Sequence, residues 1–247
     1  MRWPLWISAL VIFFLVRVVA TAPAALVVKP LAQQNVFLAG VSGTLWQGSA
    51  QSLSARANGE VLAWGRLEWA VSPWRLMTLS PEVRFSTDFG AQWMSGVVSI
   101  DGLEAIELRS LKGAVPAELA RLFAPLSLDG NFEFDFEKLL WSKAQGAVEI
   151  SGQAMWRQAL WAAPSERVPL GDYTVLLTSD TNGIAARFGT LSGPVNVEGQ
   201  VRAADNRYEV DLLINPTGRH EAKLRQNLLL IAVPEAEALR IKLSGKY

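Results

Sequence analysis

The chain has 247 residues, 50% of them hydrophobic and only 19% charged, which excludes a disordered protein and fits a single folded unit. Lysine plus arginine and aspartate plus glutamate both number 23, so there is no basic field to bind nucleic acid. The absence of cysteine excludes disulfides, thiolate metal sites and cysteine nucleophiles, and a single histidine excludes multi-histidine metal centres. Ten tryptophans against three tyrosines suit extensive sheet packing or a surface close to a membrane.

Residues 1–28 are predicted to anchor the chain in a membrane. Trp3 to Val16 carry no charge, Arg17 interrupts, and the sequence stays apolar as far as Val28. At about 1.5 Å per residue the uncharged stretch alone falls short of a bilayer core of roughly 30 Å. A spanning helix must therefore include Arg17, whose long side chain can snorkel to the interface, and Pro23 is expected to end or kink it.

A cleaved signal peptide is the alternative interpretation of this segment. Residues 20–22 (ATA) have the small-residue spacing of a cleavage site. The single charge before the apolar run and the arginine directly after it are unlike a signal peptide, so an uncleaved anchor is favoured. Charge does not fix the orientation, because Arg2 lies on one side of the segment and Arg17 and Lys29 lie on the other.

Residues 29–247 are predicted to form one β-rich domain. It opens with a short helix at 31–40, ending at Gly40, after which the hydrophobic residues follow a period of two. The clearest strand is 131–137, with Phe132, Phe134 and Phe136 on one face and Glu133, Asp135 and Glu137 on the other. Similar alternation predicts strands at 146–156, 173–179, 195–203 and 208–214.

Turn signals between these runs indicate a series of antiparallel hairpins. The Asn/Asp-Gly pairs are Asn58-Gly59, Asp101-Gly102, Asp129-Gly130 and Asn182-Gly183. Residues 116–123, which begin with a proline in a favoured first-turn position, and 218–231 are predicted as short helices. The expected fold is therefore mainly β, a curved antiparallel sheet with one or two short helices behind an N-terminal transmembrane helix.

A glycine followed three or four positions later by tryptophan recurs along the chain. The pairs are Gly43 and Trp46, Gly65 and Trp69, and Gly152 and Trp156. We interpret the glycine as a point where a strand bends and the tryptophan as the ring that covers the space left open.

Residues 41–50 (VSGTLWQGSA) contain a G-T-L-W-x-G-x-A motif. A Trp-bearing strand at 67–69, an L-x-L-x-G strand at 126–130, a G-x-x-x-W strand at 152–156 and a Leu-Gly pair at 170–171 follow in order. In the motif and in the order of these features, over nearly its whole length, the chain resembles protein N of type II secretion systems.

The resemblance implies an inner-membrane, single-pass protein with its C-terminal domain in the periplasm. Its implied function is an accessory or scaffold role in the export of folded proteins across the outer membrane. The implied partners are other type II secretion system components and inner-membrane lipids. The family is also distantly similar, at fold level, to AsmA-like envelope proteins with groove-like β-sheets, so a periplasmic lipid-binding module is the alternative function.

No catalytic, cofactor-binding or metal-binding residue is predicted, and the chain is not expected to be an enzyme, because no nucleotide, zinc or serine-hydrolase motif occurs. His220 is interpreted as a solvated surface residue. The acidic residues of 131–137 are interpreted as the wet face of a strand rather than as a cation site.

One motif is singled out as a structural or interaction site, formed by Gly43, Thr44, Leu45, Trp46 and Gly48. The favoured interpretation is a tight β turn whose Trp46 closes the edge of the sheet. The alternative is a contact surface for another secretion component.

Overall fold

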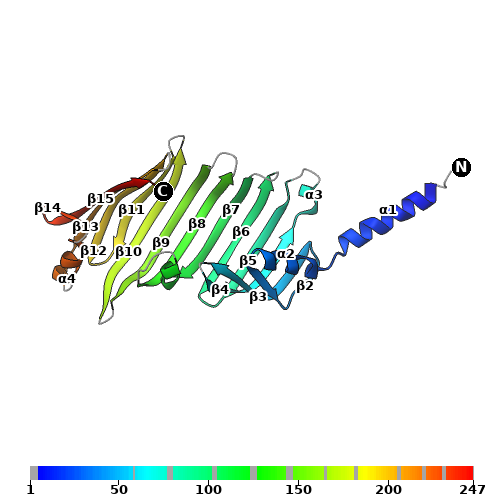
Figure 1. Cartoon of the computed structure of the whole chain (residues 1–247), viewed down its shortest axis with the longest axis horizontal. Coiled ribbons are helices and arrows are strands. Elements are labelled where there is room, and N and C mark those ends of the chain that lie inside the picture. The colour runs from blue at the N-terminus through cyan, green and yellow to red at the C-terminus, as the bar shows by residue number, and fades with distance from the viewer. Residues whose placement is uncertain are drawn as a thin grey trace.

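A single β-sheet dominates the molecule (Figure 1). The computed structural model describes residues 5–57, 59–76, 80–101, 105–122, 127–142, 147–163, 166–180, 183–204, 207–218, 221–229 and 232–246. The strands are β1 (Val36–Ala39), β2 (Ser42–Gly43), β3 (Gln47–Ala57), β4 (Glu60–Val71), β5 (Glu82–Phe89), β6 (Gln92–Asp101), β7 (Ala105–Pro116), β8 (Leu128–Ser142), β9 (Ala147–Ala163), β10 (Glu166–Asp180), β11 (Gly183–Ser192), β12 (Val195–Ala204), β13 (Arg207–Pro216), β14 (Val233–Glu235) and β15 (Ala238–Lys246).

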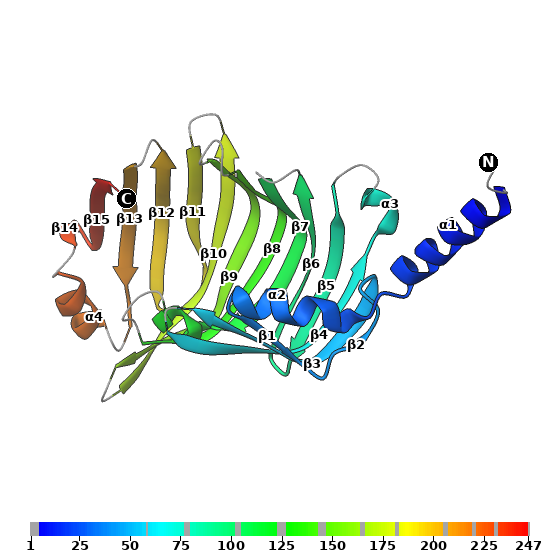
Figure 2. The same ribbon diagram turned by 45° about the vertical axis from the view of Figure 1, so that its right-hand side comes forward.

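The described helices are short and lie at the N-terminus or between strands. The N-terminal helices are α1 (Leu5–Ala20), the 3-10 helix η1 (Ala24–Val27) and α2 (Val28–Gln33). The helices in connections are α3 (Pro73–Leu76), the 3-10 helix η2 (Ala117–Leu122) and α4 (Glu221–Leu228). Figure 2 shows α2 lying beside β1 and α4 lying at the opposite end of the sheet.

The sheet is antiparallel and open. Strands β3 to β13 pair in chain order, β1 pairs with β3 at one edge, and β15 followed by β14 completes the other edge. The small strand β2 also pairs with β3. This meander of hairpins agrees with the expected mainly β, antiparallel fold.

Side chains alternate between two unlike faces. In β8, Phe132, Phe134 and Phe136 share one face, where they lie opposite Val115, Gly113 and Leu111 of β7. We call this the inner face and the other the outer face. One row on the inner face crosses the sheet from β4 to β15 through Trp69, Phe85, Gly96, Leu111, Phe136, Gly152, Leu177, Ala186, Val201, Val210 and Leu243.

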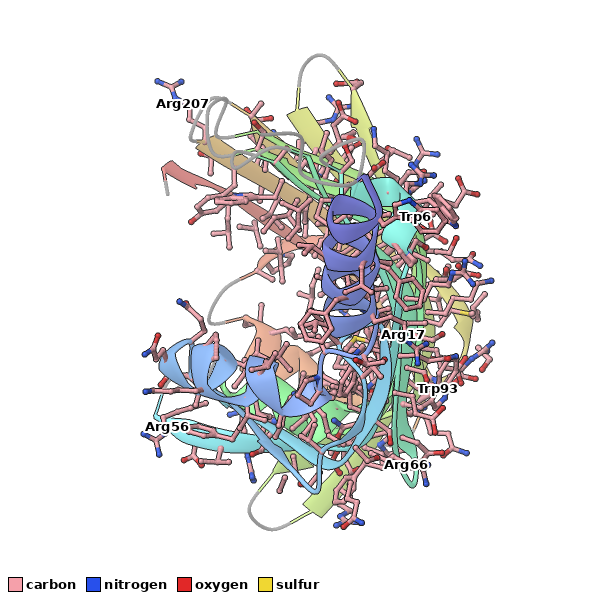
Figure 3. All side chains as sticks on the ribbon, turned by 90° about the vertical axis from the view of Figure 1, so that its right-hand side faces the viewer. Trp6, Arg17, Arg56, Arg66, Trp93 and Arg207 are labelled. Carbon is pink, nitrogen blue, oxygen red and sulfur yellow. The ribbon has the colours of Figure 1, made fainter. Side chains whose placement is uncertain are left out.

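The sheet bends, and the polar side chains lie on the outside of the bend. In the end-on view of Figure 3, the labelled outer-face residues Arg66 and Trp93 point away from the space that the strands curve around. Most side chains of the inner face are only half-buried, because the described helices and strands form no second layer over most of this sheet.

The largest buried cluster of the described residues lies at the C-terminal end of the inner face, beneath α4. Leu224 of α4 packs there with Ile214 of β13, Leu239 and Ile241 of β15, and Val195 of β12. The helix therefore covers one end of an otherwise half-exposed apolar surface.

Three local predictions need correction. Residues 31–40 do not form one helix: α2 ends at Gln33, Asn35 takes a left-handed φ of 63°, and β1 then pairs with β3. The pair Asp129-Gly130 is not a turn but a bulge within β8, where a Cβ on Gly130 would lie 2.6 Å from the carbonyl oxygen of Arg157. The helix expected at 116–123 is the 3-10 turn η2.

The predicted strands and the predicted C-terminal helix are found, with shifted ends. The helix expected at 218–231 is α4. The turns expected at 58–59, 101–102 and 182–183 each include a residue outside the described ranges, but strands end on both sides of each of them.

Within the described residues, no helix has both the length and the apolar character needed to cross a membrane. The N-terminal helix α1 has 16 residues, and it extends away from the sheet (Figure 1).

We predict that Leu224→Ala will destabilise the domain by about 2–5 kcal/mol, because it leaves a cavity in the buried cluster. Leu224 is 5% exposed, whereas the nearby Leu229 is 50% exposed and provides the matched control. Thermal unfolding of both variants measures the difference. Equal melting temperatures for Leu224→Ala and Leu229→Ala would contradict the role of α4 as a packed cover.

Candidate functional site

The G-T-L-W motif forms a tight turn between β2 and β3. The backbone N–H of Thr44 donates to the Gln47 carbonyl oxygen at 2.8 Å, and the N–H of Gln47 donates to the Thr44 hydroxyl at 3.1 Å. Gly43 and Gly48 face each other across the two strands. The local sequence therefore closes a hairpin whose own hydrogen bonds satisfy the polar groups of the turn.

Both glycines of this turn are required by close approach. Gly43 has a φ of +88°, and a Cβ there would lie 2.6 Å from the Gln47 carbonyl oxygen. A Cβ on Gly48 would lie 2.5 Å from the ring of Trp69 in β4. The motif thus allows a tryptophan on the neighbouring strand to lie flat against the turn.

Two hydrogen bonds join the turn to the end of the N-terminal helix. The indole N–H of Trp46 donates to the carbonyl oxygen of Val19 in α1 at 2.7 Å. The backbone N–H of Leu45 donates to the Ala22 carbonyl oxygen at 2.8 Å. The Val19 carbonyl oxygen also accepts from the backbone N–H of Ala22 at 3.2 Å, so the Trp46 indole is a second donor to the last turn of α1.

Two further hydrogen bonds join the turn to β4. The indole N–H of Trp69 donates to the Leu45 carbonyl oxygen at 3.2 Å, and the backbone N–H of Val71 donates to the Trp46 carbonyl oxygen at 2.7 Å. The half-buried Trp46 therefore stands between α1 and the sheet. We call this arrangement the junction, formed by Gly43, Thr44, Leu45, Trp46 and Gly48 with their partners Val19, Ala22, Trp69 and Val71.

Sequence reasoning identified the residues of the junction but not their partner. The expected role of Trp46 was to close a sheet edge, whereas its indole reaches the end of α1. Val19 and Trp46 are 27 residues apart in the sequence, so no local pattern predicts their contact. The signals present in the sequence are the indole donor of the motif and the end of the preceding helix.

An aromatic ladder crosses the middle of the inner face. Ring centroids of Phe132 and Trp156 lie 5.4 Å apart, and those of Trp156 and Tyr173 lie 5.9 Å apart. The indole N–H of Trp156 donates to the Asp129 carbonyl oxygen at 3.1 Å. The Tyr173 hydroxyl lies 2.9 Å from the Val195 carbonyl oxygen, and burial raises the pKa of this phenol, so it stays a neutral donor.

Glycines on the inner face are covered by rings from the neighbouring strand. A Cβ on Gly113 would lie 2.6 Å from the Phe134 ring, and one on Gly152 would lie 2.6 Å from the Phe136 ring. At Gly152 the covering ring is therefore Phe136 of β8 and not the expected Trp156. The ring comes from an adjacent strand, because direct cross-strand neighbours are closer than residues four apart along one strand.

The acidic residues of β8 contact cations of the protein itself. Asp135 forms an ion pair with Lys112 at 2.9 Å, and Glu133 forms one with Arg157 at 3.7 Å. No group of three or more potential metal ligands occurs among the residues that the structure describes. His220 lies outside the described residues.

Comparison with known proteins identifies the family. The family described as "Type II secretion system (T2SS), protein N" matches residues 34–241. The chain belongs to this family. Protein N is a type II secretion component of the cell envelope, and membership implies contacts with other secretion components. The family is not one of the known enzyme families.

Curated relatives from three bacteria carry the name "Type II secretion system protein N". The one from Aeromonas hydrophila is 30% identical, covering 94% of this chain and 92% of its own length. Those from Vibrio cholerae and Klebsiella pneumoniae are 25% and 28% identical, covering 89% and 86% of this chain and 88% and 82% of their own lengths. No solved structure is significantly similar to the chain.

We predict that Trp46→Ala will lower the melting temperature, the cellular level of the protein and secretion together. Removing a half-buried tryptophan and its hydrogen bond should cost about 2–4 kcal/mol. Trp46→Phe, which keeps a ring and loses the bond to Val19, should cost only about 1 kcal/mol.

Trp74→Ala is the matched control for the melting temperature alone, because Trp74 is 80% exposed and its loss should change stability by less than about 0.5 kcal/mol. If Trp46→Ala left stability untouched but abolished secretion, the junction residues would be a contact surface for a partner and not a structural element.

Proposed function

We propose that this protein N is an inner-membrane accessory of the type II secretion system, in which residues 1–28 anchor a periplasmic domain formed by residues 29–247. Family membership supports the assignment to the secretion system. The exposed apolar surface of α1 is the observation that carries the anchor.

Every α1 side chain that the structure describes is exposed, and the apolar ones range from Val11 at 47% to Trp6 at 84%. A helix that is apolar all round is stable only when a membrane or another protein surrounds it. Its 16 residues correspond to about 24 Å, somewhat less than a hydrocarbon layer of about 30 Å. Local thinning of the bilayer and the long side chain of Arg17 accommodate such a short span.

The scaffold role is supported by the open, single-layer sheet. Two wide faces of different chemistry and two strand edges are available for contacts with other secretion proteins. The outer face carries cross-strand ion pairs such as Lys138 with Glu149 at 2.6 Å and Arg240 with Asp211 at 2.7 Å. These exposed pairs make the outer face polar and charged, unlike the inner face, and the role requires no catalytic residue.

We predict that alkaline phosphatase fused after Tyr247 will be active in cells, because the enzyme matures only in the periplasm. Sequencing the N-terminus of the same envelope protein provides the control and should find residues 1–28 retained. A stable but inactive fusion would contradict the topology. A mature chain beginning near Ala22 or Pro23 would contradict the anchor.

A second candidate function, a lipid-binding module, is favoured by the inner face alone. The apolar row from β4 to β15 is continuous, and most of its side chains are half-buried instead of packed under a second layer. Acyl chains have the chemistry to cover such a surface, since each buried methylene contributes about 0.8 kcal/mol.

We predict that Ile106→Glu will lower the amount of phospholipid that copurifies with the full chain, because it places a charge on the inner face. Leu176→Glu is the matched control, because Leu176 lies on the outer face. The two side chains are similarly exposed, Leu176 at 46% and Ile106 at 38%. Mass spectrometry of extracted lipid gives the ratio of lipid to protein. Any lipid held by α1 is common to both variants, so an equal ratio would rule out the inner face as the lipid site.

A further inference from the structure

A fully exposed tryptophan lies on the short helix α3, between β4 and β5. Trp74 is 80% exposed. Burying an indole is strongly favourable, so Trp74, at the connection between β4 and β5, is available to insert into a surface outside the sheet. Neither the junction nor the inner face uses this residue.

The base of α3 is firmly held. The N–H of Ser72 donates to the Glu82 carbonyl oxygen at 2.9 Å, and the N–H of Arg75 donates to the Ser72 carbonyl oxygen at 3.2 Å. The Glu82 carboxylate pairs with Arg75 at 3.4 Å and with Arg109 at 2.9 Å. Glu82 is itself nearly buried, at 12% side-chain exposure, so this ion-pair group ties α3 to β5 and β7.

A short chain of hydrogen bonds connects α3 to the end of the N-terminal helix. The Val19 carbonyl accepts from the Trp46 indole, and the Trp46 carbonyl accepts from the N–H of Val71. Only Ser72 separates Val71 from the first residue of α3. The junction therefore holds α3 close to the point where α1 leaves the sheet.

The views of the whole molecule agree with this connection. In Figures 1 and 2, α3 lies at the end of the sheet from which α1 extends, to one side of α1. Once α1 is in a bilayer, the surface of that bilayer passes near the C-terminal end of α1. That plane is the nearest large apolar medium to Trp74.

We propose that Trp74 is a second membrane contact, inserted in the interfacial layer of the same bilayer that holds α1. This inference rests on the proposed anchoring role of α1. Tryptophan suits this position because its ring is apolar and its N–H can bond to water or headgroups. With α1 as one point of attachment and Trp74 as another, the sheet cannot rotate freely about α1, and its inner face keeps a fixed orientation to the membrane.

The absence of cysteine in the natural chain makes a direct test possible. Trp74→Cys, Phe14→Cys and Val233→Cys are each labelled with a polarity-sensitive fluorophore in the full-length protein. Phe14 lies in α1, and Val233 is 70% exposed in β14 at the far edge of the sheet. The proteins are placed in vesicles of phosphatidylethanolamine and phosphatidylglycerol that contain lipids with a spin-label quencher at a shallow or a deep position.

We expect the label at position 74 to shift to the blue and to be quenched more by the shallow quencher than by the deep one. The label at position 14 should be quenched more by the deep one, and the label at position 233 should be quenched by neither. Position 14 quenched with position 74 unaffected would overturn the second contact and leave the anchor intact. No quenching at position 14 would overturn the anchor and this inference with it.

A partner protein or a second copy of the chain on α3 is a separate outcome of the same experiment. It would appear as a blue shift at position 74 without quenching by either lipid, and it would overturn the membrane contact. Equal quenching at positions 74 and 233 would also overturn it, because the sheet would then lie on the membrane along its whole length.

Discussion

The hydrogen-bonded register between neighbouring antiparallel strands keeps the apolar side chains on one side of this sheet. Side chains alternate along each strand, so a slip of one residue would exchange the faces of a whole strand. Along one row that runs from Trp69 in β4 to Leu243 in β15, the paired residues remain apolar from strand to strand. Bulges such as the one at Gly130 let the strands bend while the faces stay separate.

A sheet of one layer has a physical consequence for its inner face. Ordinary domains bury an apolar sheet face against a second layer, but here α4 covers only one end of it, around Leu224. Aromatic rings compensate locally by covering glycines on adjacent strands, as Phe134 covers Gly113. The rest of the face stays half-buried, which is why both candidate functions, contact with secretion proteins and binding of lipid, depend on it.

The junction fixes how the sheet is held relative to α1. A helix joined to a domain by a flexible linker would leave the domain free to turn, whereas Trp46 bonds to Val19 on one side and to Val71 on the other. Through these few hydrogen bonds the short motif connects α1 to β4. They also hold α3, with its exposed Trp74, near the end of α1.

The sequence by itself determined the family, the mainly β fold and the two faces of β8, because motif order and period-two alternation are local properties of the chain. It also singled out the motif of the junction, Gly43, Thr44, Leu45, Trp46 and Gly48, without its partners. Only the tertiary structure decided that Trp46 bonds to Val19, that the glycines are covered from neighbouring strands, and that Asp129-Gly130 is a bulge. These features depend on which residues meet across strands, and a local pattern carries no information about such long-range contacts.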